Sequence, residues 1–163
     1  MRLTFVPAVL VCLSFVPIAY GQTKKPPGFA GCPVTIPRTS PEFVKDAIDI
    51  GNAYWSGNLY AGAFWPDGTV PIGPRSVGSI LPDGSLQMKY AWFRAAGLTG
   101  RLTITGRRLD AEAPPLKADI PNGYLATGFQ ASALIFPTEG CWEITGKVAD
   151  TTLTFVNRVI RAE

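Results

Sequence analysis

The sequence contains no histidine among its 163 residues. This absence excludes Ser-His-Asp and Cys-His catalysis, and it removes the commonest zinc ligand. The glycine-containing segments "GLTG" and "GNAYWSG" lack the Lys-Ser/Thr pair and the helix that a phosphate-binding loop requires. Charge is also sparse, and a net charge of +3 at pH 7 is too small to indicate a nucleic-acid partner. The sequence therefore predicts no catalytic motif, no metal site and no cofactor.

The first 21 residues have the pattern of a signal peptide. Arg2 gives a positive start, Leu3 to Ile18 form an apolar run, and small residues stand on either side of Tyr20. The run is shorter than the roughly 20 apolar residues of a membrane-spanning helix, and prolines interrupt it. We expect cleavage after Gly21 and export to the periplasm or the exterior, with no transmembrane segment in the mature chain. An uncleaved anchor is the alternative.

Cysteine is scarce, with three in the whole chain. Cleavage removes Cys12, which is poorly placed for lipid attachment because Val11 stands where a small residue is needed. The mature chain keeps Cys32 and Cys141, and in an oxidising compartment we expect these two to form a disulfide. Two unpaired thiols are the alternative. Because Cys141 lies on the polar parity of its predicted strand, the bridge should fix the N-terminal segment to the outside or edge of the domain.

The mature chain, Gln22 to Glu163, has the length of a single domain. Residues 22–50 are rich in proline and are predicted to be an extended segment tied down by the disulfide. Within them, Ser40-Pro41-Glu42 is a helix start signal, with Ser40 at the cap, for a short helical turn through Ile50. A loop lying on the core is the alternative for that turn.

Alternation of apolar and polar residues predicts an all-β domain over residues 51–163. The clearest example follows Gly84, where Leu86, Met88, Tyr90 and Trp92 share one face. A Pro-Asp-Gly turn is predicted to join strands 59–65 and 69–72. We expect an immunoglobulin-like antiparallel β-sandwich of about seven strands, with a small closed barrel as the alternative. The remaining predicted strands cover residues 101–105, 124–129 and 131–136 and a final hairpin within 136–160.

Carboxylates are the one catalytic residue class that the sequence leaves. Asp110 and Glu112 are close in sequence, and Glu139 and Glu143 flank Cys141. Two such groups on either side of a sugar would make a glycosidase. The simpler interpretation, which we favour, is that they solvate loops and strand faces. We therefore expect a protein that is not an enzyme.

The segment from Lys89 to Arg108 is the strongest candidate for a binding surface, because aromatic and cationic residues alternate in it. Trp92 or Phe93 beside Arg94 would stack on a sugar or another planar group, and Arg101 would contact an anion. In the alternative interpretation, which the alternation favours, Trp92 fills the core and the arginines lie on the solvated face.

These observations together predict a secreted or periplasmic noncatalytic module that binds a protein or glycan of the cell envelope or exterior. Its predicted ligand-binding residues are Trp92, Phe93, Arg94 and Arg101. A carbohydrate-binding domain is one alternative, and a carboxylate-dependent glycoside hydrolase is another.

Several sequence blocks extend over nearly the whole mature chain: "GCPVTIP", "LYAGAFWPDGTV", "LQMKYAWFR", "RLTITGRRLDAEAPPL" and "IFPTEGCWEITGKVADTTLTFV". In these blocks the chain resembles a group of uncharacterised exported bacterial proteins. The resemblance implies a small secreted domain in which Cys32 and Cys141 are characteristic, and it implies no activity. That group often carries a "WWR"-like run, so Trp92 and Arg94 match it, whereas Phe93 stands where a tryptophan is found.

Overall fold

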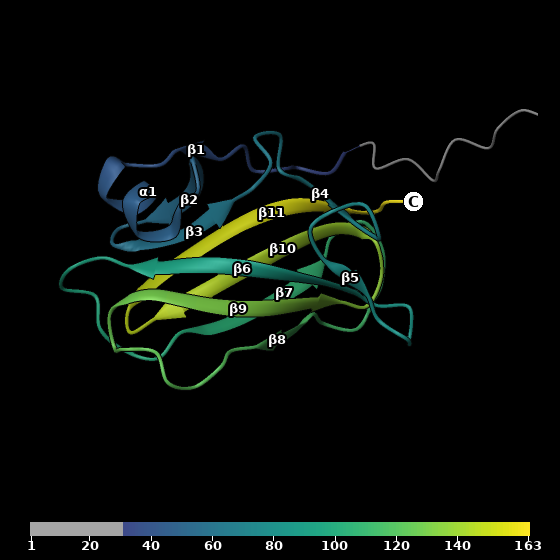
Figure 1. The fold of residues 1–163 in the computed structure, drawn as a ribbon. Coiled ribbons are helices and arrows are strands. Elements are labelled where there is room, and N and C mark those ends of the chain that lie inside the picture. Colours follow the sequence, from purple (N-terminus) through teal and green to yellow (C-terminus); the bar gives the residue numbers. More distant parts are fainter. Residues whose placement is uncertain (1–30) are drawn as a thin grey trace, which may run out of the picture.

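The computed structural model describes residues 31–163 (Figure 1). The predicted signal peptide, with its cleavage point and Cys12, lies outside the described residues, as does the first part of the Pro-rich segment. The described part contains one helix and eleven strands. The helix is α1 (Glu42–Ile48), and the strands are β1 (Arg38–Thr39), β2 (Asn52–Ser56), β3 (Leu59–Ala63), β4 (Thr69–Ile72), β5 (Ser79–Ile80), β6 (Leu86–Arg94), β7 (Thr103–Arg108), β8 (Lys117–Asp119), β9 (Gly128–Phe136), β10 (Gly140–Val148) and β11 (Thr151–Arg161).

The strands form two sheets that face each other across one core (Figure 1). The larger sheet has the order β1-β2-β3-β6-β9-β8, with β5 paired to the start of β6, and the smaller has the order β4-β11-β10-β7. The predicted all-β antiparallel sandwich is confirmed. The prediction of about seven strands was too low for the described residues, and immunoglobulin-like connectivity stays a prediction.

The period-2 pattern correctly predicted which face of β6 is buried. Leu86, Met88, Tyr90 and Trp92 are all 4% exposed or less, while the residues between them are more open. Trp92 is the largest of these side chains, and it reaches across the core to the smaller sheet. A Cβ atom on Gly146 of β10 would lie 2.4 Å from the Trp92 ring, so only glycine leaves room for the indole there.

Two strand predictions are wrong, and in the first the turn sequence did not determine which strand pairs with the next one. The Pro66-Asp67-Gly68 turn is present, but the strand that follows does not pair back onto β3. It crosses to the other sheet, where β4 pairs in parallel with β11. The predicted strand 124–129 is also wrong, because only Gly128 and Phe129 belong to β9 and the residues before them form a loop.

The helix α1 covers the outer face of the larger sheet. Its buried residues Val44 and Ile48 pack with Tyr60 of β3 in a second apolar cluster outside the main core. The predicted helical turn is therefore confirmed, although its cap is not the one expected. Pro41 occupies the N-cap position, and the Ser40 hydroxyl instead donates a hydrogen bond to the carbonyl of Ile50.

The described helix is too short and too polar to cross a membrane.

The predicted disulfide between Cys32 and Cys141 is confirmed, with a Cα–Cα distance of 5.6 Å. Cys141 lies on the face of β10 opposite to Trp142, which is buried in the core, and the N-terminal segment covers its side chain. Farther along, Thr35 exchanges two hydrogen bonds with the backbone of Val156 in β11. The bridge therefore fixes the N-terminal segment along the outside of the smaller sheet.

A buried polar triad lies between the sheets. The hydroxyl of Tyr90 donates to the side-chain oxygen of Asn157 over 2.8 Å, and the Asn157 amide donates to the hydroxyl of Tyr54 over 2.7 Å. Asn157 is 1% exposed. Burial raises the pKa of Tyr54 to about 12, and burial also raises the pKa of Tyr90. The hydroxyls of Tyr54 and Tyr90 thus share one partner, the side-chain amide of Asn157.

Removing the disulfide should lower stability strongly. The bridge joins residues 109 positions apart, and the loop-closure model assigns about 4.7 kcal/mol to a loop of that size. The double variant Cys32→Ala, Cys141→Ala should lose up to that amount of unfolding free energy, measured by guanidinium unfolding. Reductant should destabilise the unaltered protein and leave the variant unchanged. Equal unfolding free energies for the two proteins would contradict the prediction.

The polar triad should show non-additive energetics. Asn157→Ala leaves two tyrosine hydroxyls without their partner and should cost about 2–3 kcal/mol of unfolding free energy. Adding Tyr90→Phe removes one of the unsatisfied hydroxyls, so the double variant should lose less than the sum of the single losses. Urea unfolding of all four proteins measures this. Strict additivity would show that the residues do not act as a unit.

Candidate functional site

A pocket lies at the end of the sandwich where β6 finishes. Two loops form it: residues 95–102, which connect β6 to β7, and residues 120–127, which connect β8 to β9. Figure 1 shows both loops at the same end of the molecule, away from the C-terminus. The pocket has a volume of about 380 Å³. That volume falls in the range of roughly 300–1,000 Å³ that is typical of small-ligand sites.

Arg94, the last residue of β6, ties the two loops together. Its guanidinium donates one hydrogen bond of 2.7 Å to the carbonyl of Gly100 and another of 2.6 Å to the carbonyl of Leu125. The side chain is 2% exposed, and its Nε finds no partner among residues 31–163. Burial lowers the pKa of this guanidinium. The two carbonyls satisfy donors of Arg94 but do not neutralise its charge.

Arg101 is the second cation of the pocket lining, and its side chain is exposed. The lining contains no acidic residue; Asp119 precedes the second loop in the sequence but is not part of the lining. The pocket therefore has a net positive charge. Its remaining lining residues are neutral: Gly100, Ile120, Pro121, Asn122, Gly123, Tyr124, Leu125, Ala126 and Gln130.

Apolar side chains stand exposed beside the two arginines. Leu125 is 79% exposed and Tyr124 is 38% exposed, and both line the pocket. The ring of Tyr124 meets that of Phe129 edge to face at 5.7 Å, and Phe129 is 41% exposed. We call Tyr124, Leu125 and Phe129 the apolar rim. Exposed apolar residues that gather beside a polar pocket are typical of an interaction site.

Phe129 is also the outer end of an aromatic row that crosses the larger sheet. Trp55, Tyr60, Phe93 and Phe129 are direct register partners on β2, β3, β6 and β9. Phe43 of α1 covers the middle of the row, since its ring lies 5.7 Å from Tyr60 and 6.4 Å from Phe93. Aromatic cross-strand neighbours stabilise a sheet. The helix thus buries the centre of the row and leaves Phe129 open beside the pocket.

The four residues predicted to bind a ligand lie in three different environments. Trp92 is fully buried, and its indole N–H donates to the Ser132 hydroxyl, so its ring is not on the surface. Phe93 belongs to the aromatic row on the outer face. Arg94 and Arg101 meet at the pocket, which is the only part of the predicted set that the structure brings together.

The loop of residues 120–127 was missed as part of the site. The sequence analysis began a strand at Tyr124, directly after this loop's turn sequence Pro121-Asn122-Gly123. No spacing in the sequence connects that turn to Arg94 or Arg101. The structure gives Gly123 a φ of +96°, which ends any extended strand there.

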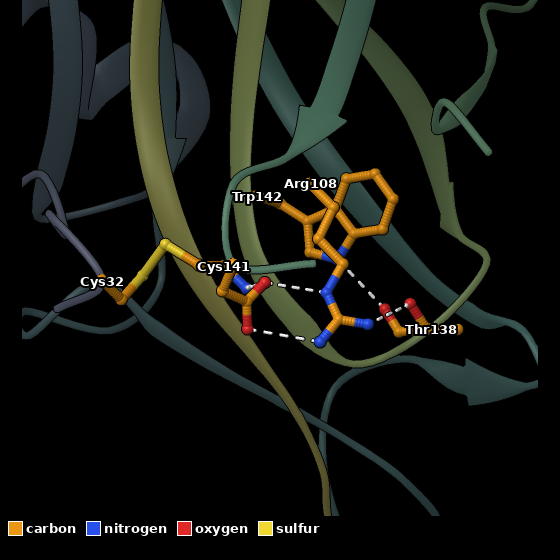
Figure 2. A network of polar contacts seen from close by, with 6 residues as sticks. Cys32, Arg108, Thr138, Cys141 and Trp142 are labelled. Atoms are coloured by element: carbon orange, nitrogen blue, oxygen red, sulfur yellow. Dashed lines mark hydrogen bonds and ion pairs between the residues drawn. A yellow bond between two sulfur atoms is a disulfide. The ribbon is translucent and has the colours of Figure 1, made fainter. Parts of the chain in front are cut away.

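Asp110, one of the candidate carboxylates, lies in a different region, next to the disulfide whose surroundings Figure 2 shows. Arg108 forms a two-pronged pair with Asp110, with distances of 2.7 and 3.2 Å, and also donates to the Thr138 hydroxyl over 3.0 Å. The same carboxylate accepts the backbone N–H of Cys141 over 3.0 Å. Figure 2 shows Arg108 directed toward Thr138, with Cys141 and Trp142 alongside. The blocks "GRRLD" and "FPTEGCWE" therefore meet in one network.

Three of the four candidate carboxylates form local contacts. Asp110 and Glu112 both border an open hollow of about 800 Å³. Hydrogen bonding from Arg108 lowers the pKa of Asp110 and so favours its ionised form. Glu143 pairs with Arg107 at 2.7 Å on the outer face, and Glu139 accepts a backbone N–H from Arg161. Asp110, Glu139 and Glu143 thus serve local contacts.

Within residues 31–163, no three potential metal-ligating side chains gather in one place. No protein-family model, curated protein or solved structure matches this chain.

Asp110 should make the free energy of unfolding depend on pH in the acid range. Its pKa is lower in the folded than in the unfolded state, so its contribution is present above the unfolded value near 4 and is lost as pH falls through the folded value. Asp110→Asn should flatten the fall of unfolding free energy below about pH 4, measured by urea unfolding across the acid range. Arg108→Gln removes the partner and should flatten it as well. Unchanged slopes in both variants would contradict this assignment.

Proposed function

We propose that this chain is a noncatalytic binding module of an exported protein, and that it contacts a partner protein through the pocket and its apolar rim. The observation that supports this most is the coincidence at one end of the sandwich of two arginines without a counter-charge and three exposed apolar side chains. Loops that project from a rigid sheet are where binding residues are usually found.

The disulfide and the signal-peptide pattern support the part of the proposal that concerns export. A disulfide persists in an oxidising compartment, and the signal-peptide pattern of residues 1–21 predicts delivery to one. Membership of the group of exported bacterial proteins that the sequence resembles is part of this proposal. The bridge and the Arg108 network make that end rigid, which suits a domain that presents its opposite end to a partner.

The arrangement favours a protein partner over a glycan. Sugar platforms use exposed rings that lie in one plane. The ring pair at the pocket is not of this kind, because Tyr124 and Phe129 meet at 66°. The partly exposed pairs Phe64–Trp65 and Phe43–Phe93 meet at 60° and 55°. Tyrosine, phenylalanine and arginine are enriched at protein interfaces, and all three gather at this end of the sandwich.

The test compares partner recovery by two matched double variants of the full chain. Arg101→Glu, Leu125→Asp alters the pocket end and should reduce recovery of a specific cross-linked partner from the native envelope about tenfold or more, which is the effect of losing an interface anchor. Arg75→Glu, Val77→Asp makes the same change of charge at exposed positions near β5, at the opposite end of β6, and should recover the partner fully. Circular dichroism verifies that both variants fold.

Equal recovery by the unaltered protein and the pocket variant would remove the pocket end as the interface. Loss of recovery only in the Arg75→Glu, Val77→Asp variant would place the interface at the other end of the sandwich.

A further inference from the structure

The charge of Arg94 gives the pocket a preference for anions. A buried cation is destabilised unless an opposite charge lies near it, and within residues 31–163 the Arg94 guanidinium donates to two neutral carbonyls. No acidic side chain lines the pocket that Arg94 borders. An anion placed in this pocket would offset part of that unfavourable energy. The folded chain is therefore prepared to receive a negative group at this point.

The exposed parts of the pocket supply the direct contacts for such a group. Arg101 carries a planar guanidinium, which suits a planar carboxylate with two parallel hydrogen bonds. Among residues 31–163, none of the loop hydrogen bonds to backbone carbonyls is donated by Gly123, Tyr124 or Leu125, and these three residues are exposed. Free amide donors in a loop add further contacts for an anion.

The apolar rim gives the ligand a second feature. Leu125 and Tyr124 line the same pocket as the arginines, and Phe129 extends the apolar surface next to it. A small inorganic anion would leave these side chains exposed to water. A group that carries a large apolar body directly beside its charge would cover them, with a gain of about 25 cal/mol for each Å² buried.

We propose that the pocket binds a carboxylate that is directly followed or preceded by a large apolar side chain of a partner protein. The inference rests on the proposed function and names the chemical group of the partner that the pocket recognises. The carboxylate comes either from the C-terminus of a polypeptide or from an acidic side chain next to an apolar residue. Arg101 contacts it, the charge of Arg94 attracts it, and the apolar rim covers the neighbouring side chain.

The experiment titrates the full chain with three short acetylated peptides and with inorganic phosphate, and follows the amide signals of Gly100, Gly123 and Ala126 by NMR. The first peptide ends in leucine with a free carboxylate, the second is the same peptide amidated, and the third is amidated with an internal Glu-Leu pair. The free acid or the Glu-Leu peptide should bind about tenfold tighter than the amide, since a charged hydrogen bond contributes about that factor. Whichever of the two binds identifies the source of the carboxylate.

Three variants locate the binding. Arg101→Gln should weaken binding of the carboxylate peptide about tenfold, and Leu125→Ala should weaken it while leaving the salt dependence of binding unchanged. Arg75→Gln removes a charge at the opposite end of β6 and should leave the affinity as it was. The inference would be overturned if neither the free acid nor the Glu-Leu peptide bound more tightly than the amidated leucine peptide, or if phosphate bound as tightly as the best peptide.

These outcomes separate the inference from the proposed function. If the peptides fail but the Arg101→Glu, Leu125→Asp variant still loses its partner, the pocket end is an interface that does not recognise a carboxylate. If the carboxylate peptides bind at the three amides while that variant keeps its partner, the pocket is a carboxylate site but not the partner interface.

Discussion

The contact of Trp92 with the facing sheet is the constraint on which the rest of the structure depends. The indole lies over Gly146 and near Phe155, whose ring centroid is 6.1 Å away, and no other residue at position 146 would leave it room. Strand β6 is thereby fixed in register and in orientation. Because side chains alternate along a strand, the inward direction of Trp92 sets the direction of the residues after it. Phe93 faces outward and Arg94 faces inward.

The candidate site follows from that alternation. Arg94 is the inward-facing residue at which β6 ends, so its guanidinium emerges where the core ends and the loops begin. There it finds loop carbonyls instead of apolar side chains, and it joins the two loops that form the pocket. Phe93 faces outward and continues the aromatic row to Phe129 beside the pocket. Core packing and the candidate binding surface are therefore consequences of one strand's register.

The two ends of the sandwich have different physical characters. At one end, the disulfide holds the N-terminal segment against the start of β10. The charges of Arg108 and Asp110 neutralise each other there. At the other end, Arg94 and Arg101 have no counter-charge within residues 31–163, and the apolar rim is open to water. Paired charges contribute to the stability of the fold. Unpaired charges and exposed apolar surface become more favourable when a partner covers them. This contrast is why we place the function at the pocket and not at the carboxylates.

The sequence by itself determined the all-β class, the buried face of β6, the final hairpin and the pairing of the two cysteines, because alternation and cysteine number are local or countable properties. It did not determine that β4 crosses to β11, since the Pro-Asp-Gly turn sets the direction of the chain but not the strand that will accept it. It grouped Trp92 with Arg94 and Arg101 because they are close in sequence, although alternation buries the first. Only the tertiary structure could bring residues 120–127 to the arginines, because that contact depends on how β8 and β9 pack and not on any spacing within the chain.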